Sequence, residues 1–229
     1  MEYIITMAEI MFKHRDGLDF NNLKTKNVDG KRHYDTPGGL YPSVTTITSQ
    51  VGKEAIKEWR ERVGPEEANR IVNKASRRGT RVHKICEDYI NNIEIDYKDI
   101  EPINHFLFKQ IKPILDIHLQ EVLGVECALY SDYLRVAGRV DCVGIFDGKA
   151  SIIDFKTSGK RKRRDWIQNY FMQESAYAVM FEERYKIPVS QLVTIIAVDS
   201  DEPQLFIENR DDYIQEFINY RDLWESNQS

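Results

Sequence analysis

The sequence predicts a mixed α/β domain: a central mixed β-sheet flanked by helices, preceded by an N-terminal β-hairpin and a helical subdomain. Residues 53–92 and 101–119 follow a helical pattern, residues 122–158 form three consecutive strand-like segments, and the residues after 158 alternate helical and strand-like segments. No repeat or linker divides the 229 residues, so we expect one domain. Within it we expect a hairpin region at 1–52, a helical region at 53–120, a sheet core at 121–209 and a C-terminal helix at 210–229.

The N-terminal half should form a hairpin and then helices. Residues 27–48, NVDGKRHYDTPGGLYPSVTTIT, combine β-forming residues with D-G and P-G-G turn signals. Helices should begin near Lys53 and continue to about residue 92. A further helix is predicted from Glu101 to Leu119, because Pro102 fits a first helical turn; Pro113 should kink or divide it.

The second half should form a β-meander followed by mixed elements. Turn sequences S-D-Y and D-G-K separate the segments VLGVECALYS, LRVAGRVDCVGIF and ASIIDFKTS. A long helix is predicted from Asp165 to about Tyr185, ending before Pro188. QLVTIIAVDS and PQLFIE then predict two strands, and a helix from Asp211 to Trp224 closes the chain.

The composition limits the class of protein. No segment approaches the roughly 18 apolar residues of a membrane span, and MEYIITMAEIMFKHRD lacks the basic start and cleavage site of a targeting segment. We therefore expect an intracellular protein without a membrane partner. Cys86, Cys127 and Cys142 form no C-x-x-C pair, so we expect them to be reduced core residues.

The charges are unevenly distributed along the chain. The net charge is −5, from 37 acidic and 32 basic residues, but residues 199–229 hold nine acids and two bases, which leaves 28 acids and 30 bases before them. Such local excesses can matter more than the net charge. Basic residues form two clusters: KRKRR at 160–164, and a helical group formed by Arg70, Lys74, Arg77, Arg78, Arg81 and Lys84. Either cluster alone would be interpreted as a solvated face.

Two aspartates and a lysine interrupt the apolar strands of AGRVDCVGIFDGKASIIDFKTS, residues 137–158. An unpaired buried charge is costly, so such residues bind a metal or one another. Asp154 and Lys156 share one face of a strand, and the turn at 147–149 brings Asp141 beside them. Two carboxylates favour a hard cation such as Mg²⁺ or Mn²⁺, with Lys156 orienting or helping to deprotonate a bound water. The alternative is an ordinary Asp–Lys ion pair.

These residues resemble the PD-(D/E)XK nuclease core, in which a strand aspartate precedes [D/E]-x-K on the next strand. RRGTRVHKICEDYI resembles the R-G-x-x-H helix of RecB-like nucleases, and QESAY matches their Q-x-x-x-Y pattern. YPSVTTITS is similar to the P-S-V-T segment of phage exonucleases and mitochondrial genome maintenance exonucleases. The matches run in order from Tyr41 to Tyr177 and together are specific.

The resemblance implies a restriction-endonuclease-like nuclease core and a site for one or two Mg²⁺ or Mn²⁺ ions. The catalytic residues would be Asp141, Asp154 and Lys156, and the metal ligands would be His83, Asp141, Asp154 and the backbone carbonyl of Phe155. Glu87 would orient His83 or be a surface acid, and Glu126 is a weaker ligand candidate. Gln173 and Tyr177 would face the site and steady Lys156 or the nucleic-acid backbone; core packing is the alternative. DNA contacts are expected from Ser43, Thr45, Arg77, Arg78, Arg81, Thr157, Lys160, Arg161, Lys162, Arg163 and Arg164.

The resulting hypothesis is a phage-type, metal-dependent DNA exonuclease that acts on single-stranded ends in replication, recombination or repair, in the cytoplasm of a bacterial or phage-infected cell. The chain lacks the four cysteines that hold an iron–sulfur cluster in some relatives, and it lacks a P-loop, so we expect neither that cluster nor a nucleotide cofactor. Replication or recombination proteins would supply any unwinding. The alternatives are an inactive DNA-binding recombination accessory protein and an endonuclease on the same core.

Overall fold

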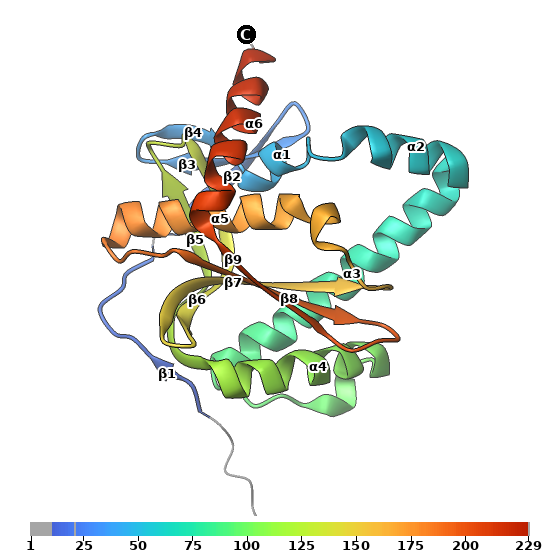
Figure 1. The fold of residues 1–229 in the computed structure, drawn as a ribbon, viewed down its shortest axis with the longest axis vertical. Coiled ribbons are helices and arrows are strands. Elements are labelled where there is room, and N and C mark those ends of the chain that lie inside the picture. The colour runs from blue at the N-terminus through green and yellow to red at the C-terminus, as the bar shows by residue number, and fades with distance from the viewer. Residues whose placement is uncertain (1–10, 21, 229) are drawn as a thin grey trace, which may run out of the picture.

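A mixed β-sheet forms the centre of the molecule (Figure 1). The structure is a computed structural model that describes residues 11–20 and 22–228. Within these residues, β5, β6 and β7 form the predicted antiparallel meander, β8 runs parallel to β7, and β9 is antiparallel to β8. The predicted mixed sheet is therefore confirmed. In sheet order its strands are β1 (Lys13–His14), β5 (Leu119–Ser131), β6 (Val136–Phe146), β7 (Lys149–Ser158), β8 (Gln191–Val198) and β9 (Gln204–Asn209).

Helices cover both faces of this sheet. Strand alternation sends Ile153 and Phe155 into the core beneath α3 (Pro65–Ile90) and α4 (Pro102–His118), whereas Ile152 enters the core beneath α5 (Gln168–Tyr185). Helices α1 (Val44–Thr48) and α6 (Ile214–Ser226) pack on the α5 side. Single 3₁₀ turns precede α4, α5 and α6 at Tyr97–Asp99, Arg164–Trp166 and Arg210–Asp212. The helices predicted from Asp165 and Asp211 therefore begin with 3₁₀ turns.

The N-terminal region forms a small second sheet. The predicted hairpin is present and has a third strand, because β2 (Lys24–Val28), β3 (Lys31–Thr36) and β4 (Gly39–Pro42) pair in sequence. Our prediction that helices begin near Lys53 is wrong, since α1 begins at Val44. The Ser43 hydroxyl accepts the Thr46 N–H at 3.0 Å and caps this early helix, a local signal that the strand-like composition obscured.

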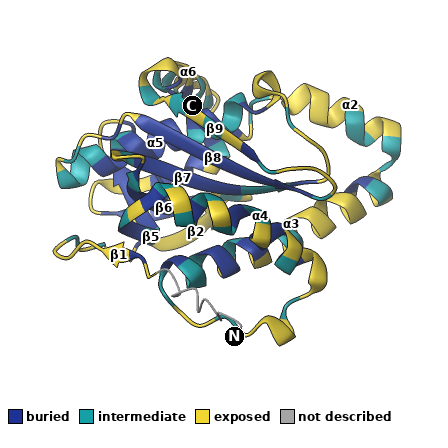
Figure 2. Cartoon of the chain, turned by 60° about the horizontal axis from the view of Figure 1, so that its bottom comes forward, coloured by how far each residue is buried: buried dark blue, intermediate teal, exposed yellow. Residues whose placement is uncertain are grey.

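The region 53–92, which we expected to be helical, consists of α2 (Lys53–Val63) and α3, separated by Gly64, whose φ of 86° is left-handed. Every residue of α2 is at least partly exposed, and α2 projects beyond the sheet with the first half of α3 (Figure 2). Helix α4, by contrast, is not divided at Pro113. Pro113 lies on its exposed side, while the buried Leu107, Ile111 and Leu115 hold the opposite face.

Two further expectations concern composition. The three cysteines are free and buried, as predicted. No helix within the described residues is both long enough and apolar enough to cross a membrane. The expected absence of a targeting segment concerns mainly residues 1–10, which lie outside the described residues.

Candidate active site

Strands β6 and β7 separate at the two predicted aspartates. Their ladder runs from Phe146 paired with Lys149 to Cys142 paired with Ile153. Beyond that point β6 remains paired with β5, and β7 remains paired with β8. Asp141 and Asp154 are the first residues past the last pair, so their side chains lie at the fork between the strands.

The Asp141 carboxylate takes over a backbone hydrogen bond at this fork. Its Oδ2 accepts the Phe155 N–H at 3.0 Å. The N–H and C=O of a strand residue point towards the same neighbouring strand, so the Phe155 carbonyl is also directed to the Asp141 side. This orientation is compatible with the predicted role of that carbonyl as a ligand.

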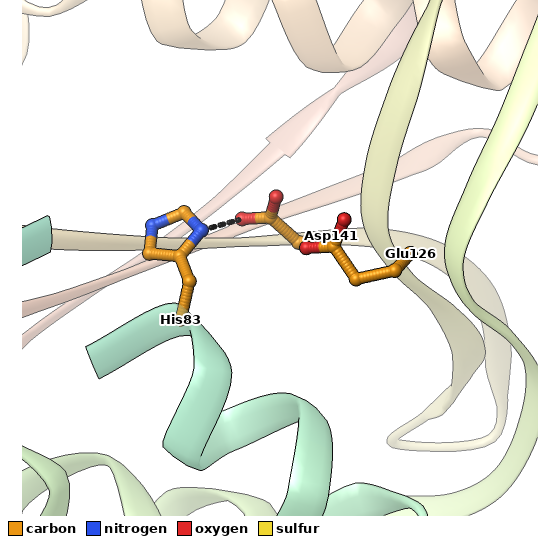
Figure 3. Close-up of side chains that lie close together, drawn as sticks. All are labelled: His83, Glu126 and Asp141. Atoms are coloured by element: carbon orange, nitrogen blue, oxygen red, sulfur yellow. Dashed lines mark ion pairs between the residues drawn. The ribbon is translucent and has the colours of Figure 1, made fainter. Parts of the chain in front are cut away.

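Three side chains that can bind a metal converge beside the fork (Figure 3). One ligand atom each from His83, Glu126 and Asp141 lies within 4.8 Å of the other two, and His83 Nδ1 is 3.4 Å from Asp141 Oδ2. His83 comes from α3, whereas Glu126 lies on β5 at a left-handed φ of 49°. We refer to these three residues as the ligand cluster. Its three members come from three different elements.

Asp154 and Lys156 form a second group next to the ligand cluster. As predicted, they share one strand face, and Lys156 Nζ forms an ion pair with Asp154 Oδ2. Gln173 Nε2 donates to Asp154 Oδ1 at 2.9 Å, so Gln173 contacts the acid rather than the lysine. Lys156 Nζ also lies 5.2 Å from the centroid of the Tyr170 ring, a contact that we had not predicted.

The pKa directions show a crowded acidic site. Burial and the Asp141 charge raise the pKa of Glu126 to about 6. Burial also raises the pKa of Asp154, although Lys156 opposes this effect. Three other pKa shifts run against the effect of burial, because a neighbouring opposite charge outweighs it. His83 lowers the pKa of Asp141, and Asp141 raises the pKa of His83. Asp154 likewise raises the pKa of Lys156. A bound cation would favour the ionised form of all three carboxyl groups.

Two of the predicted supporting residues, Glu87 and Tyr177, and the predicted DNA contact Ser43 have other contacts. The Glu87 carboxylate pairs with Lys84 at 3.2 Å, and no side-chain hydrogen bond or ion pair joins it to His83 in the described structure. Tyr177 is 3% exposed and packs against Gly138, where an added Cβ would lie 2.7 Å from the Tyr177 ring. Its ring is therefore in the core and not in reach of a bound strand. Ser43 is buried as the cap of α1, while Thr45 is exposed.

Acidic residues near the C-terminus pair with both basic clusters. Arg78 Nη1 donates to both carboxylate oxygens of Asp199 at 2.6 Å. In the 160–164 segment, Arg161 pairs with Asp201 and Arg164 with Glu208, while Arg163 pairs with its neighbour Asp165. The segregation of charge along the sequence is thus largely lost in the fold. Among the described residues, the charged side-chain ends of Lys74, Arg77, Lys160 and Lys162 have no hydrogen-bond or ion-pair partner.

A buried acid that we had not singled out lies next to Gln173. Glu174 is fully buried, and the Thr194 hydroxyl donates to its Oε1. Burial, followed by the Asp154 charge, raises its pKa well above the usual value. The available signal was a glutamate in the apolar segment QESAYAVMF.

Comparison with known proteins identifies exonucleases as relatives. No family model matches the chain. Mitochondrial genome maintenance exonuclease 1 of Homo sapiens is 25% identical over 178 residues, which cover 72% of this chain and 51% of that protein. The Mus musculus protein is 27% identical over 175 residues, with 71% and 51% covered. This chain thus spans about half the length of these relatives.

Among solved structures, a candidate exonuclease of Eubacterium rectale superimposes with a TM-score of 0.43 at 15% identity, covering 65% of this chain and 64% of that one. The sequence relatives confirm the resemblance that the motifs indicated. The chain is similar in sequence to the mitochondrial genome maintenance exonucleases, and this similarity is consistent with the PD-(D/E)XK nuclease superfamily.

Proposed function

We propose that the protein is a PD-(D/E)XK deoxyribonuclease that hydrolyses phosphodiester bonds from single-stranded DNA ends with the aid of a divalent cation. The observation that carries the proposal is the convergence, at the fork of β6 and β7, of the ligand cluster and the Asp154–Lys156 pair. Two separate groups with complementary chemistry therefore lie side by side. The exonuclease relatives support the same reaction class.

The residues of the fork fit a divalent cation. The ligand cluster offers two carboxylates and an imidazole; oxygen donors suit Mg²⁺ and Mn²⁺, and the nitrogen donor favours Mn²⁺ of the two. We assign the cation to His83, Glu126 and Asp141, with Asp154 and the Phe155 carbonyl as further ligands. When bound, such an ion activates water and stabilises the charge of the transition state and leaving group.

The protein's own groups would position the reacting parts. Lys156 is held between Asp154 and the Tyr170 ring, so its ammonium group can donate to the attacking water or to a phosphate oxygen without losing its orientation. Gln173 fixes the other oxygen of Asp154. We therefore assign Lys156 to orienting and charge stabilisation, and Gln173 to positioning Asp154.

The surface beyond Lys156 suits an unpaired strand. Trp166 is 63% exposed, with the Arg163 guanidinium 5.4 Å from its ring centroid. Exposed aromatic rings stack on unpaired bases, which a duplex does not offer. Thr157, Lys160 and Lys162 follow Lys156 along the chain and would contact phosphates. Thr45 would contribute a hydroxyl, whereas Ser43 would act through the fold of α1.

End-labelled single-stranded, duplex and circular DNA incubated with Mg²⁺ or Mn²⁺ would test this function. We expect stepwise shortening of the single strand only when metal is present, and no attack on circular single-stranded DNA. Cutting of the circle would indicate the endonuclease alternative. Failure of the protein to cut any substrate with either metal, while it still binds DNA, would favour the inactive accessory alternative. The processes of replication, recombination or repair and the cellular compartment remain predictions from the sequence.

A further inference from the structure

A stripe of basic side chains runs along α3. Arg70, Lys74, Arg77 and Arg81 are spaced by four, three and four residues, which places them on one face of the helix. We refer to these four residues as the α3 stripe. The helix continues without interruption through Gly79, so the stripe is continuous over this length.

The α3 stripe is turned away from the candidate active site. His83 is two residues beyond Arg81, which is a rotation of about 200° around the helix axis. Gly79, two residues before Arg81, faces the sheet, because a Cβ added to it would lie 4.0 Å from the Thr157 hydroxyl. A phosphate bound by the stripe is therefore not the one at the fork. Arg77 and Arg81, which we expected to contact DNA, therefore lie on a different face of α3 from His83.

The α3 stripe instead forms one wall of a groove of about 660 Å³. The start of α4, with Glu101, Ile103 and Asn104, forms the opposite wall, and Asp199 also lines the groove. The residues of the ligand cluster and the Asp154–Lys156 pair are not among its lining residues in the described part of the chain. The groove is thus separate from the fork.

The cations of the groove are not all neutralised. Arg70, Arg78 and Arg81 pair with Glu67, Asp199 and Glu101, respectively. Lys74 and Arg77 have no ion-pair partner among residues 11–20 and 22–228. An anionic ligand would therefore meet two available positive charges spaced by one helical turn.

Two uncharged residues that line the groove, Asn104 and Ile103, can contact parts of a ligand other than its anionic groups. Asn104 is 2% exposed, and its Oδ1 is buried without a hydrogen-bond partner in the described structure. To satisfy that oxygen, a ligand must carry a hydrogen-bond donor. Nucleobases carry N–H donors, whereas a phosphate diester has none. Ile103 is 40% exposed and offers an apolar surface. Phosphates, donors and apolar ring faces occur together in a nucleic-acid strand.

We propose that this groove binds a stretch of single-stranded nucleic acid that lies outside the cleavage site, on the far side of α3 from His83. The inference rests on the proposed function and adds to it a second contact region that favours long strands. Lys74 and Arg77 contact phosphates there, and Asn104 accepts from a base. Shorter strands that end at the fork do not reach these residues.

A double variant, Lys74→Gln with Arg77→Gln, tests the groove without breaking an ion pair. The matched control is Lys24→Gln with Lys149→Gln, which removes two exposed charges from the small sheet and the β6–β7 turn. In metal-free binding to a long single strand, two lost phosphate contacts should lower the log–log salt slope by about 1.4 relative to the control. An equal slope for the two proteins would overturn the proposal.

A length series of end-labelled strands then locates the contact. The loss in kcat/KM of the groove variant should increase with strand length, because only long strands reach the groove. An equal loss at every length would place Lys74 and Arg77 at the cleavage site and overturn the inference. If the wild type cut no DNA but the salt slopes still differed, the proposed nuclease function would fail while the groove remained a nucleic-acid site.

Discussion

Glu126 lies opposite Asp141 on neighbouring strands. The pairs Val125–Cys142 and Cys127–Val140 flank them in the β5–β6 ladder, and one carboxylate oxygen of each belongs to the ligand cluster. Glu126 was only a weak ligand candidate in the sequence, because Glu and Asp on adjacent strands of unknown register need not meet. The register between β5 and β6 brings these two acids together, and the following prediction depends on that contact.

Glu126→Gln should weaken Mn²⁺ binding at least about tenfold, because it removes one ligand of a small set. Thermal unfolding measured over a Mn²⁺ titration would report this, since metal that binds the folded state raises Tm. Glu87→Gln is the matched control, because it removes a nearby acid that lies outside the ligand cluster. Equal Mn²⁺ responses of the two variants would remove Glu126 from the metal site.

The metal-free protein should lose stability relative to Glu126→Gln as the pH rises from about 4.5 to about 6. The pKa of Glu126 is raised from 4.5 to about 6 in the folded state, so the folded chain holds this proton longer than the unfolded chain. Deprotonation therefore favours unfolding, by about 1 kcal/mol above pH 6 once the partial exposure of Glu126 is considered. Denaturant unfolding at several pH values, with chelator present, measures the difference. A constant gap between the two proteins would contradict it.

Asp154→Asn or Lys156→Ala should lower the cleavage rate by at least about 10²-fold, a loss typical of removing one stabilising group at a reaction centre. Metal-free DNA binding should survive, because neither change touches the free cations of the 160–164 segment. Single-turnover cleavage and filter binding separate the two effects. Asp147→Asn, an exposed acid at the distal turn of the meander, serves as the control. Wild-type cleavage by the Asp154 variant would refute the proposed site.

Lys160→Gln with Lys162→Gln should raise KM while leaving the single-turnover rate at saturating DNA nearly unchanged. Contacts to phosphates away from the scissile bond act on the ground and transition states alike. The salt slope should fall by about 1.4, or roughly 0.7 per lost contact with a single strand. The double variant Arg161→Gln with Arg164→Gln is the comparison, because these arginines already form ion pairs with Asp201 and Glu208. We expect its salt slope to change less than that of the lysine variant. A larger slope change in the arginine variant would show that DNA displaces the two acids.

Arg78→Met should destabilise the protein by about 1–3 kcal/mol, because it removes charge-assisted hydrogen bonds to Asp199 from a side chain that is only 14% exposed. Chemical unfolding would measure the loss. The double variant Arg78→Met with Asp199→Leu should recover part of the loss, since no unpaired acid remains. A stable single variant with a reduced salt slope would instead support the direct DNA contact that we first predicted for Arg78.

Local patterns were sufficient to predict much of the fold. Period-two alternation determined that Asp154 and Lys156 share a face, and turn residues separated β5, β6 and β7 at the expected places. Helical periodicity likewise predicted that Arg70, Lys74, Arg77, Arg78 and Arg81 share one helix face; four of them form the α3 stripe, whereas Arg78 pairs with Asp199. These relationships lie within one element or between strands joined by a tight turn, where geometry depends only on neighbouring residues.

Relationships between distant elements required the tertiary structure. The sequence contains Asp199, Asp201 and Glu208 as an acidic tail, but only the packing of β8 and β9 beside α3 and the 160–164 segment pairs them with arginines. The fork of β6 and β7, the position of Glu126 opposite Asp141, and the direction of the α3 stripe were also decided at this level. Periodicity states which residues share a face, and packing against the rest of the molecule determines what that face meets.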